Sequence, residues 1–200
     1  MLTVQPVTLT GRVVRLEPLT AAHVPALAVA GADEDIWHYM LYGPVTTEAQ
    51  MREWVQDLLA RQAGGTDLPF AVIHLETGRA AGCTRYMDIQ PQNRGLEIGG
   101  TWYGTAYQRT AVNTECKYLL LSHAFEELGC LRVQLKTDLR NERSQRAIER
   151  IGAQREGVLR DHMILPDGYI RSSVYYSVLR AEWPRVKARL EDALETGGRK

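Results

Sequence analysis

Residues 137–153 read TDLRNERSQRAIERIGA, and this stretch decides the fold. A strand pattern passes to a helix at Asn141, which is a favoured N-cap residue, and Gly152 ends the helix. The inward positions of the helix are apolar: Ala147, Ile148 and Ile151. The pattern predicts a strand, a turn and a helix over 142–151 that packs on a sheet. Asn141 is either a plain N-cap or a residue that also contacts a ligand.

A second helix start lies upstream, at residues 107–114 (YQRTAVNT), between a strand that ends near Tyr103 and a long apolar helix pattern. Free N–H groups and the positive end of the helix dipole make such a start an anion site, most often for phosphate. The alternative is a plain connection that Thr110 or Asn113 caps. Neither a Walker A loop nor G-x-G-x-x-G occurs, which weakens a Rossmann-type interpretation.

The rest of the chain alternates between strand and helix patterns. Strands are expected at 13–19, 70–75, 80–89, 96–103, 131–137, 153–165 and 169–179. Helices are expected at 21–30, 48–63, 112–128, 142–151 and from 183 onward. The turn at 76–79 makes its two strands an antiparallel hairpin. The order predicts one α/β (α+β) domain over 1–200, with a core over 9–183 and a C-terminal helix over 183–195.

Composition narrows the class of protein. The chain of 200 residues holds 24 Lys and Arg against 24 Asp and Glu, so no surplus of positive charge favours nucleic acid as a partner. No apolar run approaches the roughly 20 residues of a membrane span, and the N-terminus lacks the pattern of a signal peptide. Three cysteines without a C-x-x-C pair indicate a reducing compartment. We therefore expect a cytoplasmic protein without a membrane or nucleic-acid partner and without a metal.

Charge is divided unevenly along the chain. Residues 1–60 hold three basic and seven acidic side chains, whereas residues 132–161 hold eight basic and five acidic ones. One interpretation is a set of solvated faces. The other is a basic region for an anionic ligand opposite an acidic region for a cationic one.

Together, the two helix starts resemble the GCN5-related N-acetyltransferase (GNAT) family, and in particular its bacterial-type RimJ/RimL-like branch. The stretch 141–153 is similar to the N-x-x-S helix of that branch with its closing Gly-Ala, and EIGGTW at 97–102 is similar to its E-I-G-x-x-W strand. The family's cofactor loop is Q/R-x-x-G-x-G/A. Here Gln108 matches the first position, while Ala111 and Asn113 replace the glycines. Because backbone N–H groups are the donors and alanine permits helical geometry, we expect the loop to bind its ligand.

The resemblance implies a mixed, mostly antiparallel sheet of about seven strands, with helices on both faces and a splayed parallel strand pair. It implies an enzyme that moves an acetyl group from acetyl-CoA to a primary amine by direct attack in a ternary complex. The acceptor would be a protein N-terminus or a small molecule, and many members of the branch are homodimers. The alternative is a non-catalytic module of the same fold that binds CoA as a sensor or partner protein.

The resemblance also assigns roles to residues. Glu97 is the expected general base, Ser144 the acid on the leaving thiolate, and His38 a second candidate base. Their plain alternatives are a solvent-facing strand Glu, a Ser in a helix's first turn, and a packed His. The expected cofactor contacts are Ile98, Gly99, Gly100, Thr101, Gln108, Arg109, Thr110, Ala111, Val112, Asn113, Asn141, Ser144 and Arg146. The expected acceptor contacts are Trp37, His38, Tyr39 and Trp102.

Overall fold

An eight-stranded sheet forms the centre of the structure, a computed structural model that describes residues 2–197. The strand order is β1-β2-β3-β4-β5-β6-β8-β7, and β5 and β6 are the parallel neighbours in an otherwise antiparallel sheet. The strands are β1 (Leu9–Thr10), β2 (Val14–Pro18), β3 (Leu68–His74), β4 (Arg79–Gln90), β5 (Gly95–Tyr103), β6 (Arg132–Asp138), β7 (Gln154–Ile164) and β8 (Ile170–Leu179).

The prediction of a mixed, mostly antiparallel sheet with one parallel pair is confirmed, and so is the antiparallel hairpin of β3 and β4. The expected number of about seven strands is corrected to eight. The additional strand, β1, has two residues and pairs with β2 at the sheet edge. A segment this short is below the length at which alternation of side chains can reveal a strand.

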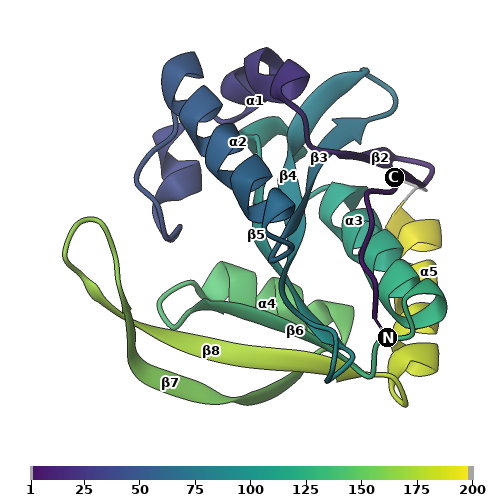
Figure 1. Ribbon diagram of the computed structural model, residues 1–200. Coiled ribbons are helices and arrows are strands. Elements are labelled where there is room, and N and C mark those ends of the chain that lie inside the picture. The colour runs from purple at the N-terminus through teal and green to yellow at the C-terminus, as the bar shows by residue number, and fades with distance from the viewer. Residues whose placement is uncertain (1, 198–200) are drawn as a thin grey trace.

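Helices cover both faces of the sheet, as expected (Figure 1). The helices α1 and α2 share a buried core with β3 and β4, and α3, α4 and α5 share a larger core on the other face. Their bounds are α1 (Val24–Ala30), α2 (Glu48–Ala63), α3 (Ala111–Ser122), α4 (Glu142–Ile151) and α5 (Trp183–Gly197). The predicted helix over 112–128 is α3 followed by a π-helical turn over His123–Glu127. In residues 2–197, no helix combines the length and apolar character that a membrane span requires.

The free cysteines lie in these cores, as the sequence predicted: Cys83, Cys116 and Cys130. Burial raises the pKa of the Cys83 and Cys116 thiols to about 12 and that of Cys130 to about 11. Thiols of such high pKa are poor nucleophiles at neutral pH, so the structure offers no support for acyl transfer through cysteine.

Candidate active site

A cavity of about 470 Å³ opens where β5 and β6 separate. The two strands pair only through Gly95–Glu97 and Arg132–Gln134. Beyond Glu97, β5 keeps its partners on β4, but its other edge has no strand partner within residues 2–197. Buried backbone N–H and C=O groups need hydrogen-bond partners. This edge is therefore suited to an extended ligand that carries amide groups.

Two glycines shape the free edge of β5. Gly100 has φ +55°, and a Cβ atom there would lie 2.7 Å from Nε of Arg85. A Cβ atom on Gly99 would lie 2.7 Å from Sδ of Met87 and 2.9 Å from Oε1 of Glu97. Side chains at these positions would displace residues that line the cavity, and the left-handed backbone of Gly100 itself favours glycine.

The start of α3 forms one end of the cavity. Oγ1 of Thr110 accepts from the backbone N–H of Val112, so the threonine is the N-cap and Ala111 is the first helical residue. The alanine that replaces the family's glycine therefore has ordinary helical geometry. Arg109 has φ +61°, a strained conformation for a residue other than glycine, and such strain concentrates at ligand-binding loops.

Gln108 ties three elements together at this end. Its Nε2 donates to the carbonyl oxygen of Tyr103 at 3.0 Å, and its Oε1 accepts from Arg143 at 2.9 Å. Gln108 thus joins the end of β5 to α4. It also lines the cavity, but both polar atoms of its amide are engaged within the protein.

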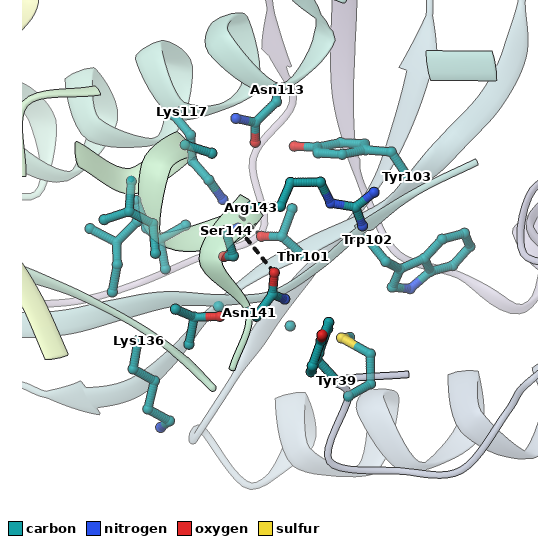
Figure 2. A pocket seen from close by; sticks show the side chains of 18 of the residues that line it. Tyr39, Thr101, Trp102, Tyr103, Asn113, Lys117, Lys136, Asn141, Arg143 and Ser144 are labelled. Atoms are coloured by element: carbon teal, nitrogen blue, oxygen red, sulfur yellow. Dashed lines mark hydrogen bonds between the residues drawn. The ribbon is translucent and has the colours of Figure 1, made fainter. Parts of the chain in front are cut away.

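The start of α4 faces the same space. Oδ1 of Asn141 accepts from the backbone N–H of Ser144 at 3.0 Å, which is the N-cap geometry that the sequence predicted. Figure 2 shows Asn141 and Ser144 beside Thr101 of β5, with Lys117 of α3 reaching toward them. Asn141, Ser144 and Arg146 line the cavity, so the Asn141 cap is also placed to contact a ligand.

Lys117 is a buried cation with a neutral partner. Its Nζ donates to Oγ1 of Thr101 at 2.8 Å, and that oxygen lies 2.8 Å from Oγ1 of Thr84. No carboxylate within residues 2–197 forms an ion pair with Lys117. Burial lowers the pKa of Lys117 to about 8. The lysine adds a positive charge to this wall that the protein itself does not neutralise.

Glu97 lies at the point where the strands separate, and it is almost fully buried. Its Oε2 accepts from Nζ of Lys136 at 2.9 Å and from Nε2 of Gln134 at 2.9 Å. The side chain lines the cavity, so it is not the solvent-facing strand residue of the plain alternative. Oε1, close to Gly99, is the oxygen that these two donors leave available.

The expected acceptor residues divide into two groups. Tyr39 and Trp102 line the cavity, but Trp37 and His38 do not. Trp37 is buried, donates from Nε1 to the carbonyl oxygen of Gly31, and packs against Trp54 and Trp102. Trp37 therefore packs in the core next to the cavity, and its expected contact with the acceptor stays a prediction. His38 is exposed, with its ring against Tyr39, so it is not the packed residue of its plain alternative either.

The cofactor contacts expected at 98–101 and 108–110 line the cavity, as does Asn113, whereas the side chains of Ala111 and Val112 do not. Several cationic residues that the sequence did not single out line it as well: Arg85, Lys117, Lys136 and Arg171. They come from β4, α3, β6 and β8, so no local motif contains them. Lys117 left one signal, because a charged residue within a helix that is apolar on most sides indicates a buried charge. Residues 2–197 hold no group of three or more His, Cys, Asp or Glu side chains placed to bind a metal ion.

The structure thus has a cavity between splayed parallel strands, next to an open helix start. A comparison of the sequence with known protein families points the same way. The model of the acetyltransferase (GNAT) domain matches residues 14–154 of the chain. The chain belongs to the GNAT acetyltransferase family. The family predicted from the two helix starts is thereby confirmed, and with it the prediction of an acetyltransferase.

Relatives of this acetyltransferase cover most of its length. A structure of a proposed acetyltransferase from T. thermophilus is 44% identical, with a TM-score of 0.87 over 96% of this chain and 99% of that one. YdaF of Bacillus subtilis, which is named as a proposed ribosomal N-acetyltransferase, is 27% identical over 84% of this chain and 90% of its own.

Mycobacterium smegmatis RimJ in complex with CoA-disulfide is 20% identical, with a TM-score of 0.80 over 94% of this chain and 95% of that one. At this identity the likeness concerns the fold. The names of these relatives agree with the RimJ/RimL-like branch that the sequence indicated.

Proposed function

We propose that this acetyltransferase binds acetyl-CoA in the cavity between β5 and β6 and acetylates a primary amine there. The observation that carries the proposal is the free edge of β5 beyond Glu97, which runs toward the open start of α3. An extended chain with amide groups matches that edge, and a pyrophosphate matches a helix N-terminus. The two features lie in one cavity, as the cofactor's two parts require.

The residues of this wall fit the proposed ligand. Backbone groups of Ile98, Gly99, Gly100 and Thr101 would hold the amide-bearing arm, and residues 108–113 would hold the phosphates. Asn141 lines the cavity with its Oδ1 already engaged as a cap, which leaves its Nδ2 as a donor for a ligand carbonyl. Arg146 lies on the exposed side of α4 at the same end and would contribute positive charge.

Acetyl-CoA supplies an activated acyl group when bound, and the protein must manage two protons around it. An ammonium group must lose a proton before its nitrogen can attack. In this proposal Oε1 of Glu97 accepts the proton, while Lys136 and Gln134 hold the other oxygen in position. The Ser144 hydroxyl, on α4 and in the lining of the same cavity, would donate a proton to the departing thiolate.

Thermal unfolding with acetyl-CoA tests cofactor binding. We expect Tm to rise with acetyl-CoA concentration, because a ligand that binds only the folded state stabilises it. Desulfo-CoA should stabilise the protein similarly, since it keeps the phosphates and the amide arm. Adenosine should not. An unchanged Tm at millimolar acetyl-CoA would remove the proposed function.

Release of the CoA thiol across a panel of primary amines tests catalysis. Glu97→Gln and Ser144→Ala should each lower kcat by roughly 10²-fold or more if they move protons, and His38→Ala measures what the exposed histidine contributes. Arg52→Ala, in an exposed pair with Glu48 on α2, is the matched control. Full activity in both Glu97→Gln and Ser144→Ala would overturn these two roles. Cofactor binding without thiol release for any amine would favour the non-catalytic module.

We further propose the cytoplasm as the location and a homodimer as the assembly, with either a peptide N-terminus or a small molecule as the acceptor. The location is supported by the free, buried cysteines. Chromatography with light scattering would measure the assembly.

A further inference from the structure

The wall of the cavity opposite α3 is formed by β6, β8 and residues 35–42, and buried ion pairs stabilise it. Nζ of Lys136 lies 2.9 Å from Oε2 of Glu97, and Nη2 of Arg140 lies 2.8 Å from Oδ2 of Asp138. A third pair, Arg85 with Asp67, lies at 3.2 Å beside the same cavity. Each of these buried carboxylates is thus neutralised by a cation of the protein, as the low polarity of an interior demands.

Arg171 on β8 is different. Only 4% of its surface is exposed, and it lines the cavity. Its Nε donates to Oγ of Ser173 at 3.0 Å and its Nη1 to the carbonyl oxygen of Tyr39 at 3.3 Å, both of which are neutral acceptors. Within residues 2–197, no carboxylate lies within 4.0 Å of its guanidinium nitrogens.

The charges around Arg171 do not replace a partner. Asp138 and Glu97 act on it at longer range, but both already form ion pairs with Arg140 and Lys136. Burial lowers the pKa of Arg171 despite these two carboxylates. A buried guanidinium that faces a cavity with donors to spare is therefore a site for an anion from outside the protein.

The phosphates of the cofactor would lie at the start of α3, which adjoins the end of β5. Arg171 belongs to a different part of the cavity lining, because it bonds to Ser173 of β8 and to the backbone of Tyr39. The amide arm and the acetyl group, which would lie along β5, carry no charge.

One interpretation of the acidic residues within 1–60 was a region that receives a cationic acceptor, and most of them lie in residues 31–57. Within the described chain, Asp35 is the one carboxylate of this segment that lines the cavity, while Arg85, Lys136 and Arg171 approach from the strands. The acceptor wall is therefore not acidic. Because Arg171 also bonds to the carbonyl of Tyr39, it lies where residues 35–42 meet β8.

We propose that Arg171 binds a carboxylate carried by the amine acceptor, so that the acceptor is an amino acid or a peptide with an acidic residue near its N-terminus. This inference rests on the proposed function, since it places the acceptor opposite the cofactor. Arg171 is a specificity-determining residue in this scheme. Its planar fork can hold a carboxylate through two hydrogen bonds while Nε and Nη1 keep their contacts with Ser173 and Tyr39.

Binding of product-like probes to the protein saturated with CoA tests this proposal. The probes are N-acetylated amino acids and N-acetylated tripeptides with Asp or Glu at the second position. Each N-acetylated amino acid is paired with its carboxamide. Each tripeptide is paired with the counterpart that has Asn or Gln at the second position. We expect one of the two acid sets to bind at least about tenfold more tightly than its amides, as hydrogen bonds to a charged group typically provide. Which set binds distinguishes a small molecule from a peptide.

Variants of Arg171 test whether this residue causes the preference for acids over amides. Arg171→Met should remove the preference for acids over amides, and Arg171→Lys should retain part of it, while neither should weaken CoA binding. Arg171→Met should leave the Tm of the free protein unchanged or raise it, because it removes an unneutralised buried charge. Arg85→Met, which leaves Asp67 buried without its cation, should lower Tm and serves as the matched comparison.

The outcomes separate this inference from the proposed function. If CoA binds but acids and amides bind equally, or neither binds, Arg171 has no such role while the proposed function stands. A clear fall in Tm for Arg171→Met with unchanged acid selectivity would assign it a structural role instead. If CoA itself fails to bind, both proposals fall.

Discussion

Two lysines approach the cavity from opposite walls, and they differ in what neutralises them. Lys136, on the β6 wall, lies 2.9 Å from the carboxylate of Glu97. Lys117, on the α3 wall, bonds only to the hydroxyl of Thr101. On the β6 wall the charges are paired within the protein, with Arg171 as the exception. On the α3 wall the cations face neutral partners or solvent. This difference is what the two proposals use: a polyanionic cofactor at the α3 wall and a single anionic group of the acceptor at the β6 wall.

Breaking the Lys136 pair should have the largest effect. Lys136→Met leaves the Glu97 carboxylate, 1% exposed, with only Gln134 as a partner. We expect a loss of about 3–5 kcal/mol in the free energy of unfolding, which is typical when one member of a buried pair is removed. Urea denaturation measures it. Arg146→Met, in an exposed pair with Glu142, should change stability by less than about 1 kcal/mol. Equal losses in the two variants would contradict the difference between buried and exposed pairs.

Removing Lys117 should instead raise the free energy of unfolding. Its pKa is about 8 in the folded protein, below its ordinary value of 10.5, so the unfolded chain binds more protons between these two pH values. The stability of the wild type should therefore rise through this window relative to Lys117→Met, and the variant should be favoured by up to about 3 kcal/mol below pH 8. Denaturation from pH 6 to pH 10 measures both proteins. Parallel stability curves would show that burial of Lys117 carries no such penalty.

A further prediction concerns the protonation of Lys117 when the cofactor binds. If phosphates of CoA neutralise the α3 wall, the pKa of Lys117 should return toward its ordinary value, and binding near pH 9 should take up about one proton. Calorimetry in two buffers of different ionisation enthalpy measures the uptake. Lys117→Met is the control, and it should abolish the uptake.

The smallest effect on stability is expected at the start of α4. Asn141→Ala removes the cap on the Ser144 N–H and should lower the free energy of unfolding by about 1 kcal/mol. Asn141→Asp keeps a cap oxygen, so it should preserve stability while its added negative charge weakens binding of CoA. Urea denaturation and a CoA titration measure the two properties separately. If Asn141→Asp binds CoA as the wild type does, Asn141 serves the helix alone.

Most elements could be predicted because their signals are local. Helix α4 begins and ends where the sequence indicated, since Asn141 caps it and Gly152 adopts φ +108° at its end. Strand β1 escaped notice because it has two residues. The cavity residues at 97–101 and 108–110, with Asn141, Ser144 and Arg146, followed from motifs, while the roles assigned to Glu97 and Ser144 stay predictions. The packing of Trp37 could not be predicted, because an aromatic side chain looks the same in sequence whether it faces a ligand or, as here, three other aromatic rings.

The sequence by itself determined the order of the elements, the family and the two helix starts, because caps, turns and apolar periodicity act between residues that are near in the chain. Only the tertiary structure decided which charges meet. Glu97 lies 39 positions from Lys136, and Glu115 of α3 accepts from the backbone N–H groups of Arg12, Val13 and Val14, about a hundred residues away. Ion pairing depends on distance in space and on burial, neither of which a linear pattern contains. For that reason only the tertiary structure shows that Lys117 and Arg171 are buried cations without a carboxylate partner in the described chain.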